Sequence, residues 1–235
     1  MDRAPRSLGA IVETQVQRWL GERQRKGIPS ASPPPVVTVS REYGARGAAV
    51  AKLVADRLQF SFWNRELLGA IAEHAHVDTA AMARFDEHHP SALAETVSGL
   101  IPGPSRVSQM DYARELGVVV RDLVSHGGAV LVGRGLNFMV DRGRALRVRV
   151  VCPLDQRIRE LAERDRITMD NARAAIGEAD RDRRAFVRDL YGKDIDDPTG
   201  YDLWINTGTM SLEAAADVVA AGVRAQFAQA AATAT

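Results

Sequence analysis

The sequence predicts an α/β fold, a doubly wound parallel sheet flanked by helices. Three observations lead to this prediction: short apolar runs alternate with helical patterns, a glycine turn follows the first run, and a Gly-Arg-Gly turn follows a later one. In open α/β sheets, ligands bind at the carboxyl ends of the strands. Both glycine turns are therefore candidate parts of a functional site.

The composition indicates one globular domain with an appendage. The chain has 235 residues, 46% hydrophobic content and a formal net charge of +1, which argues against a dedicated nucleic-acid-binding protein. Its single cysteine, Cys152, excludes an intrachain disulfide and lies in a strand-like run. No stretch resembles a signal peptide or is long enough to span a bilayer, so we expect a cytoplasmic protein without a membrane partner.

Residues 1–35 are predicted to form the appendage, with the domain at 36–228 and a frayed tail at 229–235. Apolar residues recur at helical spacing between Leu8 and Leu20, and a proline-rich linker occupies 30–35. This N-terminal amphipathic helix could dock on the domain, pair in a homodimer or lie on a membrane. Its polar face mixes both charges, which favours docking or a homodimer over a membrane surface.

The stretch 36–54 reads as a strand, a turn and a helix. The β-branched run at 36–39 suits a buried strand, and apolar residues at helical spacing follow the turn. Gly44 and Gly47 would let the backbone approach phosphate oxygens, and Arg41 and Arg46 would supply positive charge. The alternative is a plain strand-to-helix connection. The loop does not match G-x-x-x-x-G-K-[ST], because Gly47 stands at the lysine position.

Helices are expected to dominate the next section, from 64 to 125. Asn64 is predicted to cap a helix at 65–74, and a longer helix at about 110–125 is expected to end at Gly127 and Gly128. The histidines here lack a spacing that would place metal ligands on one helix face. We therefore predict no metal site made by these histidines.

The second glycine turn follows a predicted strand at 129–132 and places Arg134 at the carboxyl edge of the sheet. A further strand is expected at 147–152, after which Pro153 begins a helix at 154–164. Arg157 and Arg164 on this helix could point back to the same edge. Either could equally be a solvated helix arginine.

A dense charge run follows the predicted helix start at Thr168. An alanine-rich helix is expected to about residue 176, and the charge run ends at Tyr191 and Gly192. Mixed charge at helical spacing usually marks a solvated face. Four arginines within two turns could instead clamp a phosphate chain; they are Arg181, Arg183, Arg184 and Arg188. A last strand is predicted at 201–206 and a closing helix from Ser211 towards 227.

Four segments together resemble the cytidylate-kinase-like branch of the nucleoside monophosphate kinases, over about residues 36–227. VSREYGARG resembles the branch's serine-arginine-x-tyrosine-glycine loop, and VLVGRGLNFMV resembles its glycine-arginine segment. ADRDRR resembles the aspartate-x-x-arginine of the lid, and YGKDIDDPTGYDLWINT the segment entering the last strand. The resemblance implies ATP and Mg²⁺, acceptor-binding helices at about 64–125 and a mobile lid at about 168–196.

The resemblance also implies roles for individual residues. Arg134 and Asn64 would lie on the acceptor side, Arg183 would contact the transferring group, Asp180 would orient it, and Arg157 and Arg184 would support the lid. The residues assigned to ATP phosphates by loop and resemblance are Ser40, Arg41, Gly44, Ala45, Arg46, Gly47 and Ala48. Arg46, Asp180 and Arg183 would form the catalytic group. The expected reaction is ATP-dependent phosphoryl transfer to a nucleoside monophosphate, CMP or dCMP first.

Two alternatives stand beside this reaction. The branch usually has a glycine where Arg46 stands and a polar pair where Ala48 and Ala49 stand. Without a hydroxyl at Ala48 or Ala49, magnesium would be held by water, by Ser40 or by the nucleotide itself. These departures, with the added helix, motivate a nucleotide-binding regulator that transfers no phosphate. A kinase of another small phosphorylated acceptor is the other alternative. The retained Asp180 and Arg183 favour an enzyme.

Overall fold

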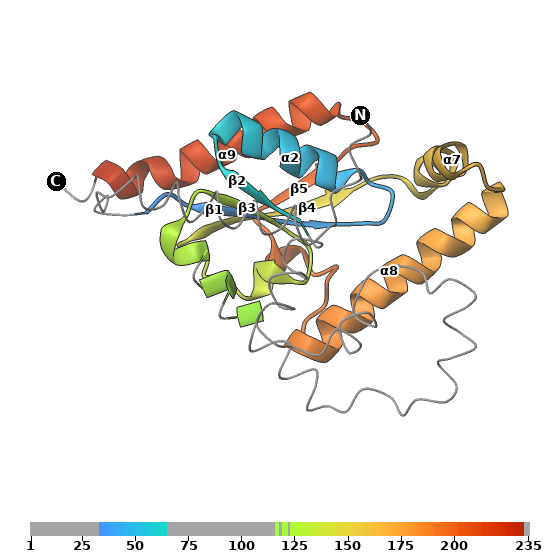
Figure 1. Cartoon of the computed structure of the whole chain (residues 1–235), viewed down its shortest axis with the longest axis horizontal. Helices are drawn as coiled ribbons and strands as arrows, with labels where there is room; N and C mark the ends of the chain where they lie inside the picture. Colours follow the sequence, from blue (N-terminus) through green and yellow to red (C-terminus); the bar gives the residue numbers. More distant parts are fainter. Residues whose placement is uncertain (1–32, 65–115, 118, 122, 233–235) are drawn as a thin grey trace, which may run out of the picture.

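A computed structural model describes residues 33–64, 116–117, 119–121 and 123–232 of the chain (Figure 1). The expected N-terminal helix, the helix at 65–74 and most of the acceptor-binding region lie outside the described residues. Where residues between 116 and 126 are described, they are helical, as expected for the later part of the helix at 110–125. Gly127 and Gly128 then adopt positive φ values of 64° and 62°, and the Gly127 N–H donates to the Leu123 carbonyl.

The described elements alternate between strands and helices. In chain order they are β1 (Val36–Arg41), α2 (Gly47–Leu58), β2 (Ser61–Trp63), β3 (Ala129–Val132), the 3₁₀ turn η1 (Leu136–Phe138), β4 (Ala145–Val151), α7 (Leu154–Asp165), α8 (Met169–Tyr191), the 3₁₀ turn η2 (Pro198–Gly200), β5 (Leu203–Asn206) and α9 (Leu212–Ala232).

The five strands form one parallel sheet in the order β2-β3-β1-β4-β5, which confirms the predicted fold class. The chain leaves β1 towards β2 on one side and leaves β3 towards β4 on the other. The two connections therefore diverge beyond the carboxyl ends of β1 and β3. This divergence opens the crevice in which ligands bind in open α/β sheets.

Helices cover both faces of the sheet (Figure 1). α2 and α9 pack on one face, where Val50, Val54 and Val219 join the inward side chains of β1, β3 and β4 in one core. On the other face Leu116, Val120 and Leu136 pack on Val36 and Leu131. All six residues of VVTVSR in β1 are buried or half-buried, as a central strand with two covered faces requires.

The bounds of four elements differ from expectation. β1 extends two residues further, so Arg41 is the last residue of the strand and not part of the turn. β4 begins earlier, at Ala145, and β5 begins later, at Leu203. α8 is one continuous helix of 23 residues that begins at a Thr168 side-chain cap and ends at Gly192.

α7 and α8 form a hairpin that projects beyond the carboxyl edge of the sheet (Figure 1). The hairpin has its own small apolar core, made by Ile158, Leu161, Ala162, Ala172 and Ile176. Among the described residues, no helix is long and apolar enough to cross a membrane.

Candidate active site

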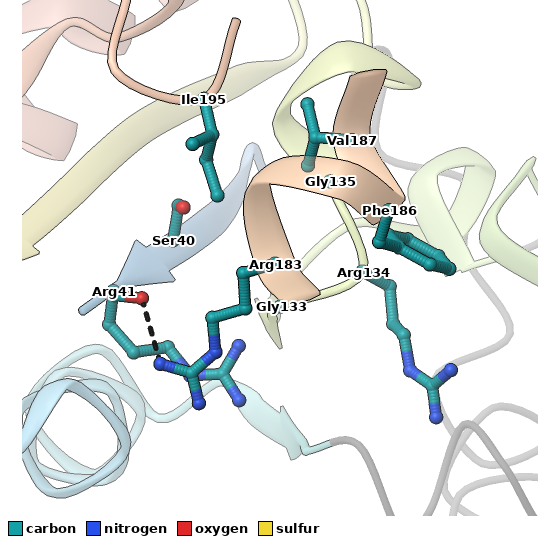
Figure 2. Close-up of a pocket in the computed structure, with 9 residues that line it drawn as sticks. All are labelled: Ser40, Arg41, Gly133, Arg134, Gly135, Arg183, Phe186, Val187 and Ile195. Carbon is teal, nitrogen blue, oxygen red and sulfur yellow. Dashed lines mark hydrogen bonds between the residues drawn. The ribbon is translucent and has the colours of Figure 1, made fainter. Parts of the chain in front are cut away.

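A small pocket lies in the crevice between the ends of β1 and β3 (Figure 2). Three arginines from three elements line it: Arg41 at the end of β1, Arg134 in the turn after β3 and Arg183 on α8. The other lining residues are Ser40, Gly133, Gly135, Phe186, Val187 and Ile195, so no acidic side chain belongs to this lining. Such a surface favours an anion of more than one charge.

The loop between β1 and α2 presents backbone donors at the start of a helix. Within the described part of the chain, the N–H groups of Gly44, Arg46, Gly47 and Ala48 donate no hydrogen bond. Arg46 precedes α2 with φ 58° and provides no side-chain cap. Unsatisfied N–H groups and the helix dipole together make this position suitable for an anion.

The two loop glycines serve different steric needs. Gly44 has a φ of 82°, a conformation that side-chain-bearing residues rarely adopt. At Gly47 a Cβ atom would lie 2.6 Å from the Arg41 Cβ and 3.2 Å from the Val150 Cβ. Gly47 therefore allows α2 to begin directly against the ends of β1 and β4. This steric need is independent of any ligand.

The Gly-Arg-Gly turn after β3 is held from behind by α8. Gly133 and Gly135 have φ values of 85° and 63°, and Arg134 between them has 57°. The Tyr191 hydroxyl donates to the Arg134 carbonyl at 2.6 Å, and a Cβ at Gly135 would meet the Tyr191 ring at 2.3 Å. Arg134 itself is 4% exposed and lines the pocket, so this turn keeps the cation at the sheet edge.

The four-arginine clamp expected on α8 is wrong in this form. Arg183 is 8% exposed and lines the pocket, whereas Arg181, Arg184 and Arg188 are exposed. Helical periodicity explains the result, because residues one, two or five positions apart cannot share one narrow buried face. Arg184 instead pairs with Asp196 at 2.7 Å.

Arg183 reaches across to the loop. Its Nη1 donates to the Arg41 carbonyl at 3.3 Å and lies 3.7 Å from the Asp180 carboxylate. Figure 2 shows its guanidinium beside that of Arg41, while Arg134 extends on the other side of the view. The solvated-face interpretation therefore does not hold for Arg183.

Asp180 and Arg157 join the hairpin to the loop. One Asp180 oxygen accepts the Tyr43 N–H at 2.8 Å, and the other accepts Arg157 Nη1 at 2.6 Å. Arg157, 6% exposed, also donates to the carbonyls of Tyr43 and Cys152. It does point back to the carboxyl edge, but its donors serve the protein itself. The side chain of Arg164 is 62% exposed and pairs with its neighbour Asp165. Arg164 is therefore a solvated helix arginine, the alternative considered from the sequence.

Sequence reasoning missed a buried arginine beside the pocket. Arg149 on β4 is 3% exposed; its Nη1 donates to the Ser40 hydroxyl at 2.9 Å and its Nη2 to Asp196 at 2.8 Å. The Tyr201 hydroxyl donates to the Ile195 carbonyl at 2.8 Å, which leaves its oxygen as an acceptor for Ser40 at 3.4 Å. Burial is the largest influence on the Tyr201 hydroxyl, and it raises the pKa of that group. The sequence contained a signal for Arg149, because an arginine within a run of valines is a charged group in a buried strand.

The described residues do not fit a magnesium ion held by protein ligands. They contain no cluster of three or more His, Cys, Asp or Glu side chains that could bind a metal. The Ser40 hydroxyl already accepts from Arg149, and Ala48 and Ala49 have no oxygen ligand to offer. A divalent ion at this site would therefore depend on ligands such as waters and the phosphates of a nucleotide.

Comparison with known proteins identifies the family. A model of the "Cytidylate kinase-like family" matches residues 36–209. The chain belongs to the cytidylate kinase-like family. It is 31% identical over 102 residues to a cytidylate kinase of Pyrococcus horikoshii, which covers 43% of this chain and 53% of that protein. A cytidylate kinase of Thermococcus kodakarensis is 31% identical over 99 residues, 42% of this chain and 45% of that protein. The chain thus spans about half the length of these curated relatives.

Solved structures share the fold. An uncharacterised protein from Eubacterium ventriosum superposes with a TM-score of 0.62 at 17% identity, over 80% of this chain and 98% of that one. A protein from Thermus thermophilus superposes with a TM-score of 0.50 at 15% identity, over 83% of this chain and 98% of that one. These two likenesses show the fold alone.

Proposed function

We propose that this member of the family transfers the γ-phosphoryl group of ATP to a nucleoside monophosphate, with CMP and dCMP as the first candidates. The observation that carries the proposal is the pocket itself. Three arginines from separate elements line one crevice at the carboxyl edge of the sheet, and no acidic residue joins the lining. The similarity to cytidylate kinases over about two fifths of the chain supports the choice of acceptor.

The loop and the pocket suggest a division of labour. The unpaired N–H groups between Gly44 and Ala48 would hold the β- and γ-phosphates of ATP, with Arg46 adding charge from the exposed side. Arg134 would bind the phosphate of the acceptor, and Arg183 would contact the group in transfer. Asp180 would act on Arg183 through the loop contacts described above and would not need to touch a substrate.

Bound magnesium would neutralise charge between the β- and γ-phosphates. Because the described residues offer it no ligand set, its position would depend on the nucleotide. The two exposed alanines, Ala48 and Ala49, are therefore compatible with an enzyme that does not hold the metal through the loop. A homodimer through the N-terminal helix and a cytoplasmic location remain predictions.

A coupled assay tests the proposal. The full chain is incubated with ATP, Mg²⁺ and, in turn, CMP, dCMP, UMP, AMP and GMP, and ADP production is followed with acceptor-free reactions as the control. We expect acceptor-dependent turnover, fastest with CMP or dCMP. ATP binding by calorimetry without turnover on any acceptor would support the nucleotide-binding regulator instead. Turnover only with a phosphorylated compound that is not a nucleotide would support the third candidate.

A further inference from the structure

Tyr43 is a loop residue that contacts the α7–α8 hairpin through both its backbone and its ring. It follows β1 by two residues and precedes Gly44, so it belongs to the segment that presents the backbone donors. Its ring packs against the apolar core of the hairpin, which includes Ile158, Leu161 and Ile176. A phosphate-binding loop does not need an aromatic residue for its own geometry. The ring therefore requires another explanation.

Both backbone polar groups of Tyr43 are bound by the hairpin. Its N–H donates to Asp180 on α8 at 2.8 Å, and its carbonyl accepts from Arg157 on α7 at 3.1 Å. Asp180 and Arg157 also pair with each other at 2.6 Å, and their side chains are 11% and 7% exposed. A buried, charge-assisted network of this kind specifies one relative position of its members.

The ring of Tyr43 also contacts the proposed catalytic arginine. The Arg183 guanidinium carbon lies 5.3 Å from the centre of the ring, within the range of a cation–π contact. The same guanidinium donates to the Arg41 carbonyl, so it is held both by its ring contact and by the backbone at the end of β1. Arg183 is thus positioned by Tyr43 of the loop and by Arg41 of β1, although it belongs to α8.

We propose that Tyr43 is a positioning residue that holds the phosphate-binding loop and α8 in one relative position. The contact with the Tyr43 ring then fixes the position of Arg183 relative to the loop. A phosphate that binds to the loop therefore meets an arginine that is already in position. This inference rests on the proposed function. It adds that residues 41–43 set the position of α8 relative to the loop. In this role Tyr43 itself touches no substrate.

The test is a double-mutant cycle in the full chain. Tyr43→Leu keeps an apolar side chain in the hairpin core but removes the ring face, whereas Tyr43→Phe keeps the ring and removes only the hydroxyl. Each is made alone and with Arg183→Ala, and kcat, both KM values and thermal unfolding are measured. Ile176→Val is the matched control, because Ile176 lies in the same apolar core, 1% exposed.

We expect Tyr43→Leu to lower kcat roughly 3- to 30-fold, the range that a cation–π contact converts to. Tyr43→Phe should retain most of the activity. In the Arg183→Ala background, Tyr43→Leu should have little further effect on kcat, because the residue it positions is gone. Ile176→Val should lower the melting temperature but leave kcat unchanged.

Two results would overturn the inference. One is a wild-type kcat in Tyr43→Leu, and the other is an equal fall in kcat with and without Arg183. If Tyr43→Leu fails to fold, the comparison of Tyr43→Phe, which keeps the ring, with Tyr43→Met, which is apolar and has none, still decides whether kcat depends on the ring. Absence of turnover in the wild-type chain would instead contradict the proposed function, so the two failures can be distinguished.

Discussion

Two groups of arginines differ in their surroundings: one group pairs with carboxylates of the protein, and the other lines the pocket. Arg147, Arg149 and Arg157, which we call the anchor arginines, each pair with a carboxylate at 2.6–2.8 Å. The pocket arginines are Arg41, Arg134 and Arg183, which line the crevice between the ends of β1 and β3; Arg183 Nη1 lies 3.7 Å from the Asp180 carboxylate. Arg134 and Arg183 are as deeply buried as the anchors, at 4% and 8% exposure against 3–6%.

Burial therefore does not separate the anchor arginines from the two buried pocket arginines. Position does, because Arg134 and Arg183 line the pocket, whereas each anchor guanidinium is matched by a carboxylate of the protein. Arg157 was a candidate for the site from sequence and is an anchor in the structure. The comparison predicts that anchor substitutions affect the free energy of unfolding, while pocket substitutions affect kinetic constants.

The largest expected effect is at Arg157. Arg157→Met should lower the free energy of unfolding by about 3–5 kcal/mol, because it leaves the buried Asp180 carboxylate without its closest cation. Denaturant unfolding followed by circular dichroism measures this. Arg173→Met is the control, since Arg173 is 58% exposed in its side chain and only 3.6 Å from Asp155; it should cost under about 1 kcal/mol. If Arg157→Met lowered the free energy of unfolding no more than Arg173→Met does, the distinction between anchor and pocket arginines would not hold.

At Arg134 the comparison predicts a kinetic effect. Arg134→Ala should raise the acceptor KM, with a loss in kcat/KM worth about 2–4 kcal/mol, because the acceptor phosphate is charged before and during transfer. Steady-state kinetics with varied acceptor measure it. Arg142→Ala, an exposed arginine that donates to the Thr199 carbonyl, serves as the control. An unchanged acceptor KM in Arg134→Ala would place the acceptor phosphate elsewhere.

Arg183 should show its effect in kcat. Arg183→Ala should lower kcat by an amount that corresponds to about 2–3 kcal/mol in activation free energy, with little change in either KM. The reason is that charge on the transferring group redistributes only during the reaction. Arg184→Ala is the matched control on the next residue of α8, where the side chain is 48% exposed and paired with Asp196. Equal kcat values for the two variants would refute the role assigned to Arg183.

The smallest effect is a pH dependence in the anchor group. Burial of Asp202 opposes its ionisation, but hydrogen bonds from the Arg147 side chain and N–H outweigh it and lower its pKa. A lowered folded-state pKa contributes stability that is present above the unfolded value, about 4, and is lost as pH falls through the folded value. Asp202→Asn should therefore lose less stability than wild type on acidification below about pH 4. Thermal unfolding across that range checks this, with Asp217→Asn, 66% exposed in its side chain, as the control.

By itself, the sequence determined four of the five strands (β1, β3, β4 and β5), the glycine turns and the order of these elements. The β-branched runs at β1 and β3, the positive-φ glycines and the Thr168 cap are local features whose physical cause lies within a few residues. The predictions of the fold class and of Arg134 at the carboxyl edge of the sheet followed from these local features, whereas the role of Arg183 was implied by the family resemblance. The family resemblance stated from the four motifs is confirmed by the match over residues 36–209.

Only the tertiary structure decided which charged groups pair. Asp180 meets the Tyr43 N–H across 137 residues, and Arg149 meets Ser40 across 109; no local pattern encodes either contact. The rotation of α8 about its axis selected Arg183 from four neighbouring arginines. The physical reason is that periodicity shows which residues share a face, whereas the packing of that face against a distant segment depends on the whole fold.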